Sequence, residues 1–471
     1  MTARPDESKA PASRGEKPPR KQDRDETPYR LTRSVCPECL QVVDARIVNR
    51  SGRLVMRKWC EQHGWFEALI SDDAALHHER RRFNKPGTIP HHFEREFHGC
   101  PESCGLCPEH QQHTCLGIIA VTEECNLRCP VCFADARKRG RHLTLDQIGA
   151  MMDRLVMCEG DPEVLQISGG EPTLHPQIVD ILAMARDRGF GKIMLNTNGI
   201  RLTEDPAFVD ELARLDVTTY LQFDGFEPET YRKLRGRDLS GMKREAVRLL
   251  AGRGMRTVLV ATLVRGVNEH ELGALVDFAL DEEFVRCLNI QPATFAGRFG
   301  KPLDDDPMDR VTLDEVVKRI AEQSRYGLEK TDFFPVPCPD PSCSLVTYIH
   351  KQGDEVRPIP RLVDIEDYLD YIKNASVVQL TDRIKEALEG LFSMSAVPGE
   401  DTTRSFCVSC GIDVDWGELE REITMISMMH FMDAHNFDLA RLQKCCVHEV
   451  LPDDGGIVPF CANNVLRRPA R

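Results

Sequence analysis

The central third of the chain alternates short apolar runs with longer amphipathic stretches. Six runs are rich in β-branched residues, as buried strands are, and they cover residues 116–122, 164–169, 192–198, 218–224, 256–264 and 287–294. Between them, Thr144 with Gln147 and Asn268 with Glu271 have the spacing of helix capping boxes. Regular strand–helix alternation predicts a parallel sheet with right-handed crossovers. We therefore predict an α/β fold with a partial (β/α)6 TIM-like barrel over residues 116–300 and a site at the carboxyl ends of its strands.

Composition divides the rest of the chain into further zones. Residues 1–30 are charged and Pro-rich and lack the apolar segment of a secretory signal, so we predict a disordered tail. Cys and His are dense after it, which predicts an N-terminal Cys-rich metal-binding domain of rubredoxin or zinc-ribbon type over 31–95 and an iron–sulfur segment over 96–115. Residues 301–471 mix helical patterns with more cysteines, and we expect an α-rich domain there that binds a cluster and substrate.

The totals of this 471-residue chain argue against several classes of function. The net charge of −14 argues against nucleic-acid binding, which needs excess Lys and Arg. No run of about 18 apolar residues occurs, so we predict no transmembrane helix, although peripheral contact with a membrane stays compatible. The 19 cysteines are odd in number and clustered, which fits metal or cluster ligation in a reducing cytoplasm better than a secreted disulfide framework.

Three cysteines directly follow the first predicted strand. The stretch TEECNLRCPVCFADA at 122–136 places Cys125, Cys129 and Cys132 at x3 and x2 spacing. A closed zinc site or a simple electron-transfer cluster takes four protein ligands. Three thiolates can instead hold three irons of a [4Fe–4S] cluster and leave the fourth iron open. Taken alone, the motif also fits three of four zinc ligands.

The next strands end in polar motifs at the same predicted edge: SGGEP at 168–172, NTNG at 196–199 and QFDG at 222–225. Gly169 and Gly170 permit close backbone approach to a ligand, and Glu171 can accept from an ammonium group. Gln222 and Asp224 face the same mouth if both point inward. Each motif alone reads as a turn, but their order at successive strand ends indicates one site.

This combination resembles the radical S-adenosylmethionine (SAM) superfamily. The resemblance implies that the amino and carboxylate groups of SAM chelate the open iron. It also implies reductive cleavage of SAM to a 5′-deoxyadenosyl radical, which abstracts hydrogen from an unactivated carbon. The cofactor-binding residues that we expect are Val131 and Phe133 at the adenine, Gly169, Gly170 and Glu171 at the methionine amino group, Asn198 at the ribose, and Gln222 and Asp224 nearby.

A separate metal site is predicted near the N-terminus. Cys36, Cys39, Cys60 and His63 follow the pattern C-x2-C-x20-C-x2-H, so each pair can form one half of a tetrahedral site. Zinc and rubredoxin-like iron are both compatible, because thiolates accept either. The alternative is a surface His63 beside a plain buried thiol.

Two auxiliary clusters are also predicted. The Cys-rich segment offers four close thiolates for a complete [4Fe–4S] cluster: Cys100, Cys104, Cys107 and Cys115. Zinc with His110 or His113 as the fourth ligand competes with this interpretation. The candidate ligands of a third cluster are widely spaced: Cys343, Cys407, Cys410 and either Cys445 or Cys461. Cys158 and Cys287 lie in helix and strand patterns and read as buried thiols.

The order of these motifs over residues 31–465 resembles one branch of the superfamily. That branch includes the archaeal tetraether lipid synthases and proteins first described as pterin C-methyltransferases. It implies carbon–carbon bond formation on an apolar, lipid-like substrate, with a flavodoxin- or ferredoxin-type protein as electron donor. Met425, Met428, Met429 and Met432 at helical spacing suit either an apolar channel or a core helix.

Two other functions stay open from the sequence. A radical SAM C-methyltransferase acting on a pterin or another small molecule is the first, although no cobalamin-domain signature is present. A non-catalytic iron–sulfur electron carrier is the second, and the open three-cysteine motif beside SGGEP argues against it.

Overall fold

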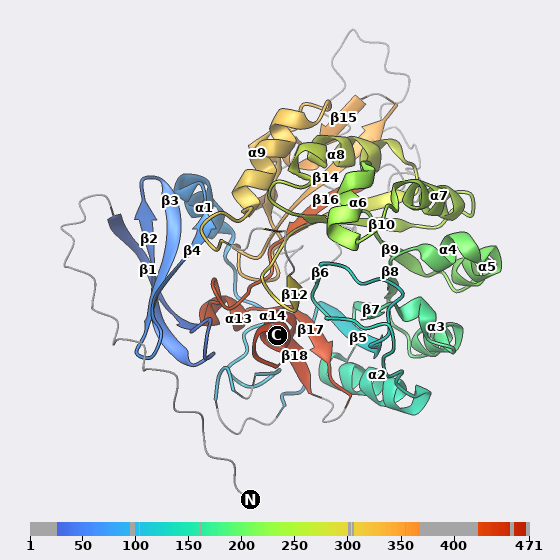
Figure 1. Cartoon of the computed structure of the whole chain (residues 1–471), viewed down its shortest axis with the longest axis horizontal. Coiled ribbons are helices and arrows are strands. Elements are labelled where there is room, and N and C mark those ends of the chain that lie inside the picture. The colour runs from blue at the N-terminus through green and yellow to red at the C-terminus, as the bar shows by residue number, and fades with distance from the viewer. Residues whose placement is uncertain are drawn as a thin grey trace, which may run out of the picture.

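The computed structural model places a small antiparallel sheet beside a large sheet with helices along its outer side (Figure 1). It describes residues 26–94, 99–102, 104–160, 162–299, 303, 306–353, 355–362, 364–366, 423–452 and 456–467. Residues 1–25 of the predicted tail, together with Cys407 and Cys410, lie outside the described residues.

The small sheet is formed by four consecutive strands in antiparallel order: β1 (Glu26–Val35), β2 (Val42–Arg50), β3 (Arg53–Cys60) and β4 (Gly64–Ser71). Ser51 and Gly52 both have positive φ, 51° and 84°, and form the tight two-residue turn between β2 and β3. The predicted tail is therefore too long by five residues, because 26–30 belong to β1. Helix α1 (Ala74–Arg80) follows the sheet.

The large sheet contains all six predicted strands as parallel neighbours in chain order: β5 (Leu116–Thr122), β7 (Val164–Gly169), β8 (Lys192–Thr197), β9 (Thr218–Gln222), β10 (Thr257–Leu263) and β11 (Val285–Pro292). The connecting helices are α2 (Leu145–Glu159), α3 (Ile178–Asp187), α4 (Ile200–Glu204), α5 (Pro206–Arg214), α6 (Pro228–Arg235), α7 (Ser240–Ala251) and α8 (Leu272–Asp281). The predicted α/β class is confirmed.

The C-terminal zone widens this sheet at both edges. β16 (Ile423–Met429) runs parallel to β11, and β17 (Val447–Val450) runs parallel to β5. Antiparallel strands continue beyond them: β14 (Ser344–Gln352) with β13 (Phe334–Pro335) and β15 (Glu355–Pro358), and β18 (Ile457–Pro459). Eight parallel strands thus lie side by side instead of six. Among the described residues no pairing joins the two ends of the sheet, so it is not a closed barrel.

The prediction of an α-rich C-terminal zone is wrong for its described part. After α9 (Leu313–Gln323) strands predominate, and the helices α13 (Leu439–Leu442) and α14 (Phe460–Ala462) have four and three residues. Met425, Met428 and Met429 lie on strand β16 and not on a helix. Unbranched Met fits both structures, so its spacing did not decide between them.

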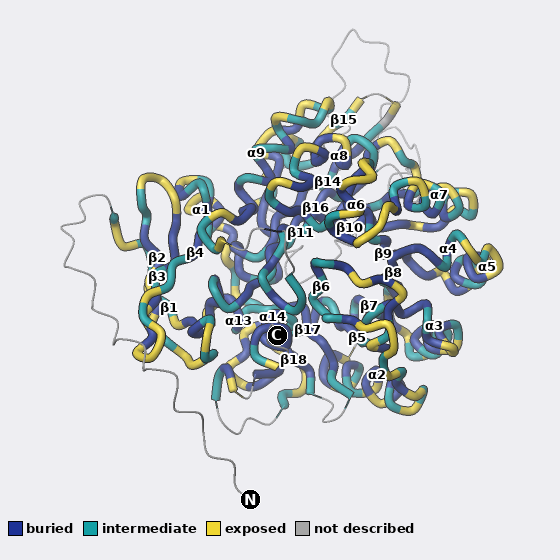
Figure 2. The backbone as a smooth tube through the Cα atoms, in the orientation of Figure 1, coloured by how far each residue is buried: buried dark blue, intermediate teal, exposed yellow. Residues whose placement is uncertain are grey.

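In the large sheet buried residues follow the strands, and exposed residues lie mainly on the outer faces of its helices (Figure 2). Strand β1 of the small sheet is instead mostly exposed or half-buried. The capping box of Thr144 and Gln147 is confirmed at the start of α2. The one predicted at Asn268 and Glu271 is wrong, because Asn268 makes no side-chain cap there. The Glu271 carboxylate instead accepts from the backbone N–H of Glu227 at 3.0 Å, at the start of α6.

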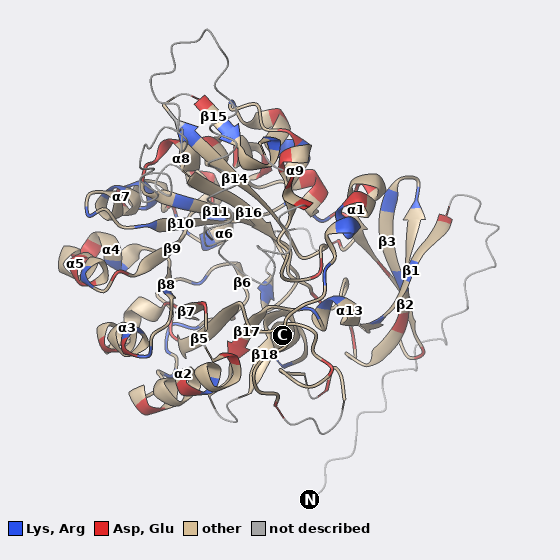
Figure 3. Ribbon diagram, turned by 180° about the vertical axis from the view of Figure 1, so that it is seen from behind, with Lys and Arg blue, Asp and Glu red and all other residues tan. Residues whose placement is uncertain are grey.

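Acidic and basic residues are interspersed on the outer helices, while the strands at the centre are mostly uncharged (Figure 3). Within the described residues, no helix is both long and apolar enough to span a bilayer.

Candidate active site and metal centres

The concave face of the large sheet encloses a cavity of about 1090 Å³. Alternate residues of each strand reach it, because successive side chains of a strand point to opposite faces; examples are Ile118, Gln166, Met194, Tyr220, Val260, Asn289 and Ser427. The lining also includes Cys125, Cys129 and Cys132, beyond the carboxyl end of β5, and Cys446, before the amino end of β17. The cavity therefore reaches both ends of the parallel strands.

Cys125, Cys129 and Cys132 lie in a loop that other parts of the chain hold from two sides. Cys125 and Cys129 are each 9% exposed. β6 (Val131–Cys132) pairs with β12 (Arg298–Phe299), and Arg298 donates from Nε to the Cys129 carbonyl at 2.7 Å. Burial raises the pKa of the Cys125 thiol to about 12, so ligand binding has to displace a proton there.

The spacing of this triad fits a cluster better than a single ion. In the described part of the chain, the triad is not among the groups whose donor atoms all lie within 4.8 Å of one another. Around a single ion the thiolates crowd together, whereas in a cluster each thiolate binds a different iron. The three cysteines therefore suit a [4Fe–4S] cluster that has one iron without a protein ligand.

The two glycines of SGGEP pack against the cysteine loop itself. A Cβ atom on Gly169 would lie 2.3 Å from the Thr122 carbonyl oxygen, and one on Gly170 would lie 2.2 Å from that of Glu124. Gly169 also has a φ of +131°, which L side chains rarely adopt. We expected these glycines to let the backbone approach a ligand. In the structure they instead let it pack against the loop that carries Cys125.

Glu171 lines the cavity and joins the ends of β7 and β8. Its carboxylate accepts from the hydroxyls of Thr173 at 2.6 Å and Thr197 at 2.7 Å, and from the Asn198 N–H at 2.7 Å. Glu171 is 1% exposed, and this burial raises its pKa. The Thr173 backbone N–H also donates to this carboxylate at 3.2 Å. A carboxylate has about four acceptor positions, so all four are used here, and an ammonium group would have to share or replace one of these bonds.

Asn198 and Gln222 are positioned by two residues that sequence reasoning missed. Asn198 donates from Nδ2 to the Asn126 side chain in the cysteine loop at 2.7 Å. Lys243 of α7 is completely buried, and its Nζ donates to the Asn198 carbonyl at 2.6 Å and to Gln222 Oε1 at 3.2 Å. A lysine in an amphipathic helix pattern suggests a solvated face, so the sequence carried no signal for this contact.

Asp224 is placed behind the cavity and not at its mouth. Arg235 donates to both carboxylate oxygens, from Nε at 2.7 Å and from Nη2 at 2.6 Å, and Asp224 is 0% exposed. The cavity lining includes Arg235. Burial raises the pKa of the Cys129 thiol, and the adjacent Arg235 charge partly opposes that rise. A direct contact between Asp224 and SAM therefore has no support in this geometry.

An aromatic wall stands beside the triad. Phe133 lies edge-on to Phe431 and Phe460, with ring centroids 5.5 and 5.7 Å away. Phe133 and Val131 both line the cavity, and their contact with an adenine ring stays a prediction.

The four N-terminal metal-site residues come together. His63 Nδ1 lies 3.5 Å from the sulfurs of Cys36 and Cys60, and the Cys39 and Cys60 sulfurs are 3.9 Å apart. All four donor atoms lie within 4.8 Å of one another. A tetrahedral ion with bonds of about 2.0–2.3 Å needs this spacing.

The remaining cysteines divide differently from the prediction. Burial raises the pKa of Cys104, and the charges of Cys100 and Cys107 raise it further. Cys115, expected as their fourth partner, is instead in disulfide contact with Cys338.

Cys343, Cys445 and Cys461 of the predicted third cluster also lie near one another. Burial raises the pKa of Cys445 well above its usual value, and the charges of Cys461, Cys446 and Cys343 contribute. The cysteine sets also interact with one another, because the Cys461 charge raises the pKa of Cys104 and the Cys343 charge raises the pKa of Cys446. The ligand sets of the auxiliary clusters therefore stay a prediction.

Comparison with known proteins agrees with this geometry. Residues 119–279 match the model of the radical SAM superfamily, and residues 28–72 match that of the HMPTM N-terminal zinc ribbon domain. The chain is 33% identical to the 7,8-dihydro-6-hydroxymethylpterin dimethyltransferase of Methanocaldococcus jannaschii, over 93% of this chain and 94% of that protein.

Other similarities are partial. The GTP 3′,8-cyclase of Chlorobaculum tepidum is 29% identical over 37% of this chain and 53% of its own length. Among solved structures, Streptococcus suis SuiB bound to precursor peptide SuiA matches with a TM-score of 0.38 and 17% identity, over 45% of this chain and 46% of that one. On the strength of the full-length relative, the chain belongs to the radical SAM superfamily, in the family of the methanogen protein, and carries an N-terminal zinc ribbon.

Proposed function

We propose that this protein is a radical SAM C-methyltransferase that acts on a pterin-like heterocycle inside the sheet-enclosed cavity. The observation that carries the proposal is the 33% identity, over nearly the whole chain, to a protein named as a pterin dimethyltransferase. The order of the motifs also resembles the lipid synthases, but the relatives reported above are named as a pterin dimethyltransferase and a GTP 3′,8-cyclase. Lipid coupling is therefore the second candidate.

The residues at the carboxyl end of β5 would hold the cofactors. Cys125, Cys129 and Cys132 would bind the [4Fe–4S] cluster, and Glu171 with the strand ends around Asn198 would receive SAM. When bound, these cofactors supply radical hydrogen abstraction from an unactivated carbon. The chain's own contribution is to orient the substrate and to keep water away from the reacting carbon.

The substrate side of the cavity carries polar groups suited to a heterocycle. Glu449 is 2% exposed, lines the cavity and accepts from Asn463 Nδ2 at 2.6 Å. Gln291 donates to Asn289 Oδ1 at 3.0 Å, and both also line the cavity. A carboxylate can accept from the neighbouring amino and ring N–H groups of a pterin, and a few polar groups on an apolar wall fix a ligand's orientation.

Carbon–carbon coupling of an apolar, lipid-like substrate is the second candidate, and the size of the cavity favours it. At about 1090 Å³ the cavity is slightly larger than the usual small-ligand site, which spans roughly 300–1,000 Å³. Apolar side chains cover much of its wall, including Ile118, Val164, Met194, Val258, Val260 and Met425.

The supporting parts of the proposal are the metals and the electron source. The zinc-ribbon match favours zinc over iron at Cys36, Cys39, Cys60 and His63. We expect two auxiliary clusters, one from each of the other two cysteine groups, and a flavodoxin- or ferredoxin-type protein as donor in the cytoplasm.

The test uses anaerobically reconstituted protein, a strong reductant and SAM labelled with ¹³C in its methyl group. With a dihydropterin substrate, the proposal predicts 5′-deoxyadenosine, S-adenosylhomocysteine and a ¹³C-methylated pterin by mass spectrometry. Deoxyadenosine with coupled lipid chains and no labelled methyl would establish the second candidate instead. Deoxyadenosine absent under all conditions would favour the electron carrier.

A variant separates substrate recognition from SAM cleavage. Glu449→Gln keeps size but loses the charge that accepts from the pterin edge, so KM for the pterin should rise about 10-fold or more, as loss of a charge-assisted hydrogen bond predicts. Deoxyadenosine formation without pterin should be unchanged. Glu245→Gln, an exposed site on α7, is the matched control. An unchanged KM in Glu449→Gln would remove Glu449 from the proposal.

A further inference from the structure

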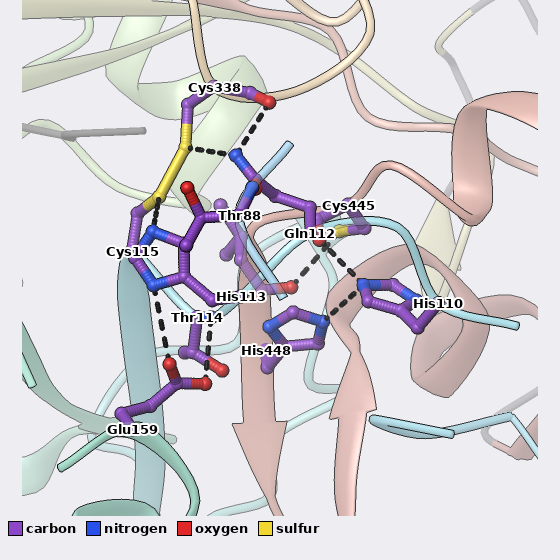
Figure 4. The surroundings of a disulfide bond; sticks show 11 residues. Thr88, His110, Gln112, His113, Thr114, Cys115, Glu159, Cys338, Cys445 and His448 are labelled. Carbon is purple, nitrogen blue, oxygen red and sulfur yellow. Dashed lines mark hydrogen bonds and ion pairs between the residues drawn. A yellow bond between two sulfur atoms is a disulfide. The ribbon is translucent and has the colours of Figure 1, made fainter. Parts of the chain in front are cut away.

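Three buried cysteines from distant parts of the chain, Cys115, Cys338 and Cys446, lie close together, and Cys446 lines the cavity. Figure 4 shows Cys115 and Cys338 with their polar neighbours. Cys115 precedes β5, Cys338 follows β13 and Cys446 precedes β17. Their sulfur atoms all lie within 4.8 Å of one another. The Cys115 N–H also donates to the Cys446 carbonyl at 3.0 Å, so the backbone holds two of the three in place.

Polar groups around these sulfurs are arranged as they are around bound metals. His113 Nε2 lies 3.6 Å from the Cys115 sulfur, and Nδ1 of the same ring lies 3.3 Å from the Glu159 carboxylate (Figure 4). A carboxylate on the outer nitrogen is the usual device that orients a metal-bound histidine. The buried Gln112 amide donates to the Cys338 sulfur at 3.1 Å, a contact that stabilises a thiolate.

The distances favour one ion over a cluster. Bonds of about 2.3 Å to sulfur and 2.0–2.1 Å to nitrogen place tetrahedral ligands about 3.5–3.8 Å apart. The His113–Cys115 separation of 3.6 Å matches the 3.5 Å between His63 and Cys36 in the zinc ribbon. Cys115, Cys338 and Cys446 meet the 4.8 Å proximity condition, which Cys125, Cys129 and Cys132 do not. His113 lies beside Cys115 but outside that group of three, so it has to move toward the ion to become the fourth ligand.

A structural disulfide explains the site less well. The Cα atoms of Cys115 and Cys338 are 7.7 Å apart, beyond the roughly 7 Å that a disulfide spans without backbone movement. A disulfide would also leave the Cys446 thiol and the Glu159–His113 pair without a role. A shared ion uses all of these groups.

We propose that Cys115, Cys338, Cys446 and His113 bind a second zinc ion, separate from the ribbon and from the iron–sulfur clusters. Four protein ligands make the site closed and structural. It ties the starts of β5 and β17 to the loop after β13, and so fixes the C-terminal strands at the edge of the core sheet. This inference does not depend on which substrate the enzyme uses.

The test is metal analysis of full-length protein purified anaerobically. Wild type should contain two zinc ions per chain, and Cys338→Ser and Cys446→Ser should each contain one, with iron unchanged. Cys36→Ser should lose the other zinc. Cys158→Ala, at a buried thiol in α2, is the matched control and should keep both.

Other outcomes overturn the proposal. Loss of about four irons with zinc retained would assign these cysteines to a cluster. Retention of all metals, with a Cys115–Cys338 peptide found by non-reducing mass spectrometry, would make them a disulfide. If the variants do not fold, zinc X-ray absorption of the wild type decides. Two ions per chain with three sulfurs and one nitrogen each support the site, and one ion per chain excludes it.

Discussion

Asp224 and Arg235 form a buried ion pair close to Cys129, with side chains 0% and 8% exposed. Asp224→Asn removes the charge that compensates Arg235, so the free energy of unfolding should fall by about 3–5 kcal/mol. Urea unfolding under anaerobic conditions measures this difference.

Asp210→Asn is the matched control for that variant. Asp210 is 64% exposed and pairs with Arg253 at the surface, where an ion pair contributes about 0–1 kcal/mol. Equal effects of the two substitutions would mean that the buried pair is not a source of stability.

At this scale the sequence predicted the ligands but not their supports. Cys125, Cys129 and Cys132 were readable because a cluster motif is a local spacing. Arg235 and Lys243 were not, because each lies on a helix whose fold brings it back to a strand end, 11 residues away at Asp224 and 21 residues away at Gln222. Burial of their charges depends on tertiary contacts that no local pattern records.

At the scale of elements, the turn after β7 has to lie flat against the cysteine loop. Gly170→Ala would place a Cβ 2.2 Å from the Glu124 carbonyl oxygen. Backbone atoms cannot move away as a flexible side chain can, so we expect a loss of about 1–3 kcal/mol in stability. Displacement of the loop should also lower the iron bound at the triad.

Gly241→Ala provides the control for this substitution. A Cβ on Gly241 meets no atom within 4 Å, and alanine favours a helix by about 0.5–1 kcal/mol over glycine. Melting temperature and iron content together check both variants. Full iron loading and an unchanged melting temperature in Gly170→Ala would contradict the packing argument.

The elements themselves were partly predictable. All six core strands appear where apolar runs and β-branched residues indicated them, because a buried parallel strand has a strong local signature. Strand β16 was read as a helix, because Met fits both structures. Glu271 was predicted to cap the helix that follows it, but it accepts from a backbone N–H at the start of α6. The sequence does not distinguish a carboxylate that caps its own helix from one that caps another helix.

At the scale of the whole molecule, the C-terminal zone completes the sheet that the core begins. β16 and β17 add parallel strands to opposite edges, and both line the cavity. These pairings join residues far apart in the chain. Periodicity therefore predicted the six core strands but not the two strands that extend the sheet at its edges. The same distance explains why the partners of Cys115 were missed.

One buried ion pair joins two distant segments of the C-terminal zone: Asp433 and Arg310, 3.0 Å apart and 0% and 1% exposed. Asp433 also accepts from the backbone N–H of Phe295 in the core at 3.1 Å. Burial raises the pKa of Asp433, but the Arg310 charge outweighs it and brings the pKa to about 2. The folded-state pKa thus lies below the unfolded value of about 3.9. The stability from this pair is full above that value and is lost as the pH falls through the folded pKa.

Asp433→Asn should therefore destabilise the protein by about 3–5 kcal/mol at pH 7. The difference from wild type should be constant between about pH 5 and 8 and shrink below about pH 4. Urea unfolding across this pH range measures it. A difference that grows toward acid would have the opposite sign and refute the assignment.

The most direct test of the central claim is 5′-deoxyadenosine formation by anaerobically reconstituted protein with SAM and a strong reductant, measured by mass spectrometry. Wild type should form it, and Cys129→Ala should not, although its zinc content and melting behaviour stay close to those of wild type. Equal amounts in the two proteins, or none from wild type with a fully loaded cluster, would contradict the placement of SAM cleavage at this triad.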